Sequence, residues 1–180
     1  VELGLGAGWS EEEHAAYGIP LPRWGERFDR LEEACAVIDT LLTNEWSNFI
    51  GEHYRLTNAR SEPKPIQKPR PPIIIGGKGE KRTLRIAARW ADEWNFPGGE
   101  PAELTHLIGI LHQHCAEIGR NPDEIGVSVK AEATIAPAAF ADLVGAYREA
   151  GAQHIIAHFP APHDPADLGR YAEHLVPVVA

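Results

Sequence analysis

Apolar residues recur at helical spacing between residues 24 and 42. The positions step by three and four along the chain: Trp24, Phe28, Leu31, Cys35, Ile38 and Leu42. One face of an α-helix repeats with this period. Charged residues, Arg27 and Asp29 among them, occupy the positions between. The pattern predicts an amphipathic helix whose charged side, with these two residues, meets water.

Strict alternation of apolar with small or polar residues predicts a strand over 125–135. Shorter apolar segments predict four more strands, at 1–5, 73–75, 92–96 and 154–159. Helical patterns follow the last four strands near 80–90, 101–118, 140–147 and 164–176. Residues typical of helix starts and ends support these limits: Pro101 and Pro165 at first helical positions, Asp164 as an N-cap, and Gly119 and Gly151 after helix ends.

Residues 43–70 connect the first helix to the strand at 73–75. Within this connection, 49–56 has the pattern of a small hairpin that turns at Gly51 and Glu52. A proline-rich stretch follows and excludes helix. Because apolar strand comes next, we interpret 43–70 as an excursion on the surface of one domain, 1–180.

The order of the elements is strand, helix, excursion, and then four further strands each followed by a helix. Such alternation predicts a parallel sheet with crossover helices, in an α/β fold. The sheet could be open and doubly wound, or part of a closed barrel. A complete (β/α)₈ barrel takes about 250 residues, and five units with an excursion take about the length of this chain. Because the chain opens on a strand, we expect three preceding units to be missing.

The richest chemical signal is the glycine loop between the strand at 73–75 and the next helix. Gly76, Gly77 and Gly79 lack side chains, so backbone N–H groups can approach a ligand closely. The helix N-terminus adds partial positive charge, and cationic side chains add whole charges: Lys78, Lys81 and Arg82. The loop suits phosphate or another anion, although a tight turn with solvated lysines would look the same. It matches neither a Walker loop nor a dinucleotide fingerprint.

Composition narrows the classes of function. The 180 residues are 43% hydrophobic and 24% charged, as in globular proteins, and the formal net charge of -9 argues against nucleic acid as the main partner. No apolar stretch reaches the length of a membrane span, and no signal peptide opens the chain. We therefore expect a cytoplasmic protein, in which Cys35 and Cys115 are reduced core thiols.

Two further groups of residues have ordinary explanations. His154, His158 and His163 resemble metal ligands, but no carboxylate accompanies them at ligand spacing, and strand alternation explains the first two. We predict no metal. Lys130 and Glu132 share one face of a strand, where a salt bridge at the rim is the simpler interpretation. They could also reach a pocket at the C-terminal end of the strand, where barrel enzymes place their chemistry.

Several consecutive segments resemble the luciferase-like monooxygenase superfamily, in order along nearly the whole chain. They are Glu2-Leu3-Gly4-Leu5-Gly6-Ala7-Gly8-Trp9, Glu13-His14-Ala15-Ala16-Tyr17-Gly18-Ile19-Pro20, Gly25-Glu26-Arg27-Phe28-Asp29-Arg30-Leu31-Glu32-Glu33, Pro72-Ile73-Ile74-Ile75-Gly76-Gly77-Lys78-Gly79-Glu80-Lys81-Arg82-Thr83-Leu84 and Ala91-Asp92-Glu93-Trp94-Asn95. The pattern is most similar to the branch associated with the deazaflavin coenzyme F-420.

The resemblance implies a TIM-type barrel of which this chain holds strands four to eight. It implies that the loop after strand five binds the cofactor phosphate, through Gly76, Gly77, Lys78, Gly79, Lys81, Arg82 and Thr83. The loop after strand four would border the cofactor ring, through Gly6, Ala7, Gly8 and Trp9, with His14 nearby. Two residues depart from the family pattern. Lys78 replaces a small hydroxyl residue and would keep or strengthen anion binding, and Glu93 replaces glycine and would put a carboxylate at the mouth of strand six.

The resemblance implies an oxidoreductase that transfers a hydride through coenzyme F-420 to or from a small organic substrate. We also expect the protein to form a homo-oligomer. An FMN-dependent monooxygenase that uses dioxygen is the first alternative. The second is a non-catalytic half-barrel that binds phosphate or associates with another chain. Trp9 could wall the ring or cover the core, and His14 could contact the cofactor or lie exposed in its loop. No catalytic acid or base can be named from these segments.

Overall fold

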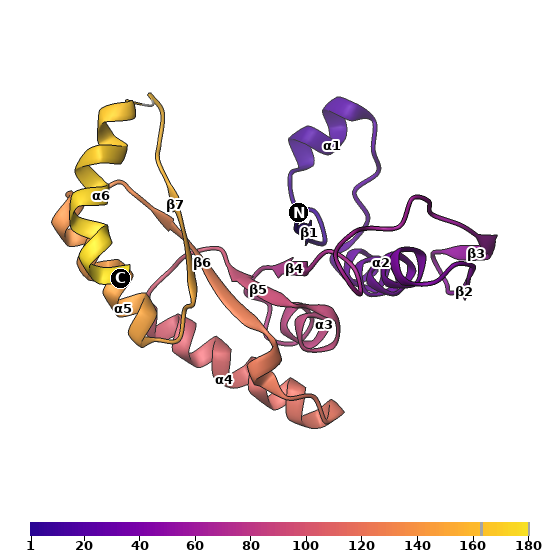
Figure 1. The fold of residues 1–180 in the computed structure, drawn as a ribbon. Coiled ribbons are helices and arrows are strands. Elements are labelled where there is room, and N and C mark those ends of the chain that lie inside the picture. Colours follow the sequence, from indigo (N-terminus) through magenta and orange to yellow (C-terminus); the bar gives the residue numbers. More distant parts are fainter. Residues whose placement is uncertain (163, 180) are drawn as a thin grey trace. The chain divides into compact units, whose positions relative to one another are not determined.

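The computed structural model describes residues 1–162 and 164–179, which form two compact units divided between Ile75 and Gly76. Figure 1 shows the elements of both. The prediction of one domain over 1–180 stays a prediction.

The first unit is built on two parallel strands, β1 (Leu3–Leu5) and β4 (Ile73–Gly76). Leu3 pairs with Ile73 and Leu5 with Ile75. Between the two strands in sequence lie helices α1 (Glu11–Tyr17) and α2 (Trp24–Thr43). The helix predicted from the apolar spacing is therefore confirmed as α2, whereas α1 is an addition to the predicted elements.

The buried face of α2 differs from the predicted one. Arg27, Leu31 and Cys35, spaced by four residues, are its buried positions, while Trp24 is 63% exposed. The prediction that Arg27 lies on the solvated side is wrong. Its guanidinium Nη1 donates to the Gly8 carbonyl at 2.9 Å, and its Cζ lies 4.0 Å from the centroid of the Trp24 ring. A backbone acceptor and an aromatic face thus hold the charge where the helix packs.

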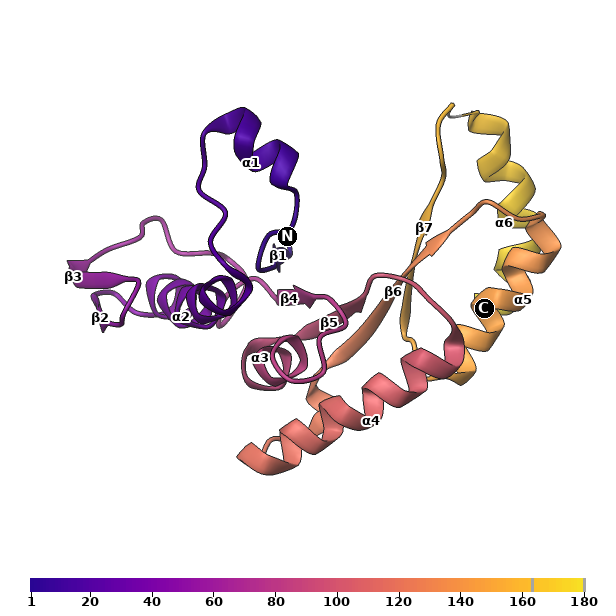
Figure 2. The same ribbon diagram turned by 180° about the vertical axis from the view of Figure 1, so that it is seen from behind.

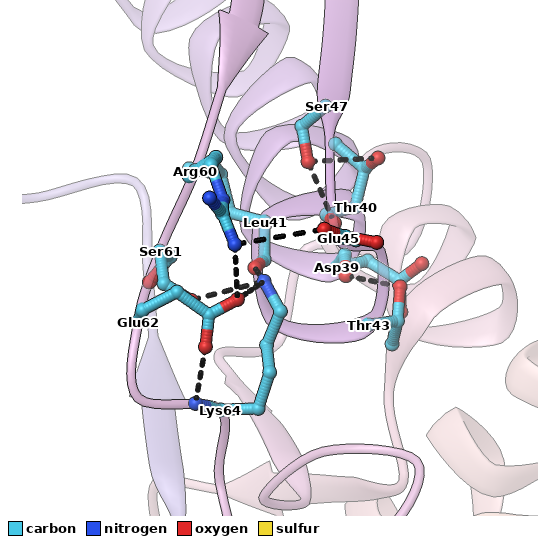
Figure 3. A network of polar contacts seen from close by, with 10 residues as sticks. All are labelled: Asp39, Thr40, Leu41, Thr43, Glu45, Ser47, Arg60, Ser61, Glu62 and Lys64. Carbon is cyan, nitrogen blue, oxygen red and sulfur yellow. Dashed lines mark hydrogen bonds and ion pairs between the residues drawn. The ribbon is translucent and has the colours of Figure 1, made fainter.

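The excursion contains the expected hairpin. Strands β2 (Ser47–Ile50) and β3 (Arg55–Ala59) pair antiparallel, with Phe49 opposite Leu56. Figure 3 shows how polar contacts tie this segment to the end of α2. Lys64 Nζ donates to the Leu41 carbonyl at 2.7 Å, and Ser47 Oγ donates to the Thr40 carbonyl at 2.9 Å. The last carbonyls of a helix have no partner within it, and the excursion supplies the Lys64 ammonium to one of them, that of Leu41.

The second unit alternates helices with three parallel strands (Figure 2). The elements in order are α3 (Thr83–Trp90), β5 (Glu93–Phe96), α4 (Pro101–Ile118), the short helix η1 (Pro122–Glu124), β6 (Gly126–Glu132), α5 (Pro137–Glu149), β7 (His154–His158) and α6 (Pro165–Val179). Trp94 pairs with Val127 across β5 and β6, and Ser128 pairs with His154 across β6 and β7. The predicted order of strands and helices is confirmed.

Glycine and capping residues account for the limits of these helices and strands. Gly119 ends α4 in the left-handed region at φ 71°, and the Asp164 carboxylate accepts the Ala166 N–H at 2.9 Å before α6. Strand β6 is shorter than predicted. The chain turns where the Thr134 N–H bonds to the Glu132 carbonyl at 3.0 Å, so the alternation beyond Glu132 is not extended strand.

The three strands of the second unit have one apolar and one polar face. Trp94, Phe96, Val127, Val129 and Ala131 are buried, and Figures 1 and 2 show α4, α5 and α6 along one side of the strands. Successive side chains of a strand point to opposite faces. The other face therefore carries a mostly polar row, in which Ile156 is an apolar member: Glu93, Asn95, Ser128, Lys130, Glu132, His154, Ile156 and His158. Asn95 Nδ2 donates to Ser128 Oγ at 2.9 Å within this row.

Candidate functional site

The glycine loop wraps around the side chain of Thr83, which begins α3 and is 4% exposed. A Cβ placed on Gly79 would lie 2.7 Å from Thr83 Oγ1, and one on Gly77 would lie 3.2 Å from Thr83 Cγ2. Gly77 also has φ 126°, which side chains disfavour. Space therefore requires glycine at position 79, and backbone conformation favours it at position 77.

The loop presents open backbone donors. Within the described part of the chain, the N–H groups of Lys78, Gly79, Glu80 and Lys81 make no hydrogen bond to another backbone group. No side chain caps the N-terminus of α3. The first N–H groups of a helix need a partner from outside it, and the helix dipole favours an anionic one. The loop thus has the donors that an anion such as phosphate requires.

The cationic side chains of this loop differ in whether a carboxylate already pairs with them. Lys78 Nζ lies 2.9 Å from Glu103 Oε2 and 4.8 Å from the centroid of the Phe96 ring. Its charge is thus already compensated by α4, which weakens the expectation that Lys78 strengthens anion binding. Lys81 is exposed and makes no ion pair with any described residue. Arg82 is half-buried.

The loop after β1 lines a cavity of about 580 Å³ within the first unit. Gly6, Ala7, Gly8 and His14 all contribute to its wall, together with Arg27. Gly8 has φ 75°, and a Cβ there would lie 3.3 Å from His14 Nε2. The structure therefore brings these four predicted ring-site residues together around one space.

His14 and Trp9 differ from the sequence-based expectation. His14 lies in helix α1 and not in a loop, and it is half-buried, with Nδ1 3.2 Å from the Ile19 carbonyl. Trp9 is 81% exposed, so it does not cover the core of its unit. The signal for α1 was present in the sequence: Ser10 Oγ accepts the Glu13 N–H at 3.2 Å, the pattern of a capping box, and Gly18 ends the helix at φ 66°.

A compact ionic cluster lies at the C-terminal ends of β6 and β7. Lys130 Nζ is 2.8 Å from Glu132 Oε1, and His158 Nδ1 is 2.5 Å from Glu132 Oε2. The hydrogen bond from Lys130, followed by that from His158, holds the pKa of Glu132 below its usual value. The expected rim salt bridge is confirmed, and His158 is an additional member that sequence spacing did not reveal.

Glu93 occupies the opposite end of the same polar face. It is the first residue of β5, so the prediction that its carboxylate stands at the mouth of the strand is wrong. The Ala-Asp-Glu-Trp-Asn motif predicts that a strand is present. Whether Glu93 lies at the start or the end of that strand depends on where hydrogen bonding to the neighbouring strand begins. Oε2 lies 3.7 Å from His154 Nδ1, and Oε1 is buried without a hydrogen-bond partner among the described residues.

Among residues 1–162 and 164–179, no three histidines, cysteines or carboxylates are grouped as metal ligands would be. His163 lies outside the described residues. In that same part of the chain, no helix combines the length and apolar character needed to cross a membrane. Both cysteines are buried and free, as predicted, and burial raises the pKa of Cys35 to about 12.

Comparison with known proteins identifies relatives along the whole chain. The family model described as "Luciferase-like monooxygenase" matches residues 1–177. An F420-dependent glucose-6-phosphate dehydrogenase of Microbacterium testaceum is 31% identical over 139 residues, which are 76% of this chain and 40% of that protein. An FMNH(2)-dependent dimethylsulfone monooxygenase of Pseudomonas putida is 31% identical over 103 residues, 57% of this chain and 28% of that protein. The chain spans less than half the length of such curated relatives.

A solved structure has a similar fold. A solved F420-dependent secondary alcohol dehydrogenase, in complex with an F420-acetone adduct, superposes with a TM-score of 0.85 at 17% identity. The match covers 99% of this chain and 69% of that one. The predicted fold class, part of a luciferase-like barrel, is confirmed by this likeness. The match over residues 1–177 confirms the predicted resemblance, and the chain belongs to the luciferase-like monooxygenase family.

Proposed function

We propose that the protein to which this chain belongs is an oxidoreductase that transfers a hydride through the deazaflavin coenzyme F-420. The glycine loop at Gly76–Thr83 carries the proposal, because it combines unpaired backbone donors with a helix N-terminus and an exposed Lys81. A phosphate of the cofactor would fit these donors. The preference for the deazaflavin comes from the resemblance of the sequence motifs and from the relative of Microbacterium testaceum.

The residues of this chain would bind and orient the cofactor, and the cofactor itself supplies the hydride chemistry. In this proposal the N–H groups from Lys78 to Lys81 hold the phosphate, while Thr83 keeps the loop in shape. The resemblance implies that Gly6, Ala7, Gly8 and His14, which line one cavity of the first unit, would border the ring. Lys78 contributes less, since Glu103 already holds its ammonium group.

An FMN-dependent monooxygenase is the second candidate, because a relative that carries FMNH(2) in its name is equally identical to this chain. The phosphate of FMN would suit the same backbone donors. The two cofactors therefore differ in what they do and not in how the loop would hold their phosphate. Binding measurements on the full-length protein separate the candidates.

Fluorescence quenching during titration of the full-length protein with each cofactor tests the proposal. We expect coenzyme F-420 to bind at least tenfold more tightly than FMN, a difference of about 1.4 kcal/mol. Tight FMN binding without deazaflavin binding would favour the second candidate. If neither cofactor binds, the proposed cofactor-dependent activity is wrong, although the assignment of the fold stands.

A further inference from the structure

Helix α4 contacts the glycine loop and brings a carboxylate to it. Lys78 Nζ lies 2.9 Å from Glu103 Oε2, and His106 Nε2 lies 3.2 Å from Oε1 of Glu80, which belongs to the loop. His114 Nε2 lies 2.8 Å from the Glu80 carbonyl oxygen. The helix thus contacts the loop through these three side chains. Glu103 is the one that adds a negative charge where the loop offers its donors to an anion.

The ion pair of Lys78 and Glu103 is packed between an aromatic ring and a glycine. Lys78 Nζ lies 4.8 Å from the centroid of the Phe96 ring, which is a cation–π distance. A Cβ on Gly99 would lie 2.8 Å from Lys78 Nζ and would also overlap the Glu103 carboxylate, so the chain after β5 lies against both groups. The ammonium group is therefore held by the carboxylate and the ring.

The side-chain charges at the loop nearly cancel. Three cations lie in the loop or follow it directly, and two carboxylates lie in the loop or contact it: Lys78, Lys81, Arg82, Glu80 and Glu103. With the histidines neutral, these groups leave at most one net positive charge. Exposed charges act over about one Debye length, about 8 Å in physiological salt. A ligand at the loop therefore experiences their sum and not the charge of Lys78 alone.

A net charge of this size suits a phosphodiester better than a phosphomonoester. A phosphodiester has one ionisable oxygen and carries a single negative charge, whereas a phosphomonoester carries about 1.5 to 2 negative charges at pH 7. Backbone N–H groups would hold either kind of phosphate, since both offer acceptor oxygens. The second charge of the monoester, however, would find no net positive charge left to offset it among these five described side chains.

We propose that Glu103, by neutralising Lys78, makes the glycine loop selective for a phosphodiester over a phosphomonoester. The inference rests on the proposed function, because it concerns the same phosphate site. It bears on the choice of cofactor, since the phosphate of coenzyme F-420 is a diester and that of FMN is a monoester. Glu103 acts through the charge of Lys78, so it determines specificity without being a ligand of the phosphate.

Two ligands that differ only at the phosphate test the selectivity of the full-length protein. One is the deazaflavin chromophore of coenzyme F-420 with its ribityl 5′-phosphate, a monoester, and the other is the methyl ester of that phosphate, a diester. Fluorescence quenching gives a dissociation constant for each. We expect the wild type to bind the diester about fivefold more tightly, which is the effect of one unit charge at close range in water.

Glu103→Gln leaves Lys78 without its carboxylate and adds one positive charge to the loop. A dianion gains about twice as much from that charge as a monoanion does. We therefore expect the affinity for the monoester to rise about tenfold and that for the diester about threefold, so that the preference for the diester shrinks. The double variant Lys78→Gln, Glu103→Gln has the net charge of the wild type and should regain the wild-type ratio of the two dissociation constants.

Glu124→Gln is the matched control. Glu124 is an exposed carboxylate 3.4 Å from Arg120 Nε, so it also belongs to an ion pair. Arg120 donates to the carbonyl groups of Ala88 and Ala91, at the C-terminal end of α3. The helix, Thr83–Trp90, spans about 12 Å and separates that end from the loop by more than a Debye length. The same loss of negative charge there should leave both dissociation constants unchanged.

The ratio of the two dissociation constants decides the inference. A wild-type preference for the diester that shrinks in Glu103→Gln and returns in the double variant supports it. A wild-type preference for the monoester, or an unchanged ratio in Glu103→Gln, overturns it while the proposed function stands. If coenzyme F-420 binds but neither probe does, recognition lies in the rest of the cofactor and the inference alone is overturned. If coenzyme F-420 fails to bind, the proposed function is overturned with it.

Discussion

At the scale of the residue, Thr83 shows how two glycines can be required by a neighbour. Gly77 and Gly79 lie against its methyl and hydroxyl groups, and neither has room for a Cβ without movement of that buried side chain. The loop is therefore shaped by packing as well as by backbone freedom. If it holds a phosphate, small changes at these glycines should alter the affinity for the cofactor.

Gly79→Ala tests whether the shape of the loop determines the affinity for the cofactor. The added methyl group would lie 2.7 Å from Thr83 Oγ1, so the loop must open to accept it. We expect the dissociation constant for coenzyme F-420 to rise about tenfold, or about 1.4 kcal/mol, in a fluorescence titration. Gly109→Ala is the control, because a Cβ on this exposed residue of α4 meets nothing within 4 Å. Equal affinities in both variants would argue against a phosphate at this loop.

Residue roles were predictable where they followed from local chemistry. The absence of side chains at Gly76, Gly77 and Gly79 was visible in the sequence, and so was the donor-rich helix start. The burial of Arg27 was not, because its partners are a distant backbone carbonyl and the Trp24 ring. Nor could the sequence show that Lys78 is held by Glu103, 25 residues away.

At the scale of the element, the hairpin of the excursion depends on a carboxylate from α2. Glu33 Oε1 accepts the Glu52 N–H at 2.8 Å, and Oε2 accepts the N–H groups of His53 and Tyr54 at 2.9 and 3.0 Å. A Cβ on Gly51 would overlap the same carboxylate. The turn at Gly51 and Glu52 was predictable, but the side chain that holds it was not.

Glu33→Gln should destabilise this hairpin in a pH-dependent way. Loss of solvation raises the pKa of Glu33, but the three N–H donors, first that of His53, outweigh it and hold the pKa below its ordinary value. A carboxyl with a depressed folded pKa contributes stability above its unfolded pKa of about 4.3 and loses it as the pH falls through the folded value. The Tm difference between wild type and variant should therefore be present at pH 7 and shrink below about pH 4.

A thermodynamic cycle with Gly51→Ala provides the control. Because both substitutions remove the same contact, the double variant should be less destabilised than the sum of the two single ones. Thermal unfolding of the four proteins, followed by circular dichroism, measures this. Additive effects, or a Glu33→Gln difference that persists at pH 3, would contradict the role assigned to the carboxylate.

At the scale of the whole molecule, cofactor binding should appear as a gain in stability. A ligand that binds only the native state adds about 2.7 kcal/mol at 100 times its dissociation constant. We expect coenzyme F-420 to raise the Tm of the full-length protein by several degrees at this concentration. In Gly79→Ala the same concentration should give a smaller shift. A larger shift with FMN would instead support the monooxygenase candidate.

Much of the fold followed from the sequence by itself. Periodicity, proline and glycine positions and capping residues determined the order of strands and helices, because these signals act over a few neighbouring residues. The motifs determined the family for the same reason, since each is a local string.

Contacts between charged groups far apart in the sequence could be found only in the folded structure. The glycine loop is open to an anion although Lys78 is paired with Glu103, and His158 joins Glu132 from 26 residues away. These contacts depend on strand register and helix packing, and a shift of one residue would send each strand side chain to the other face. That dependence on register is the reason that sequence spacing could predict the glycine loop and not the contact between Glu132 and His158.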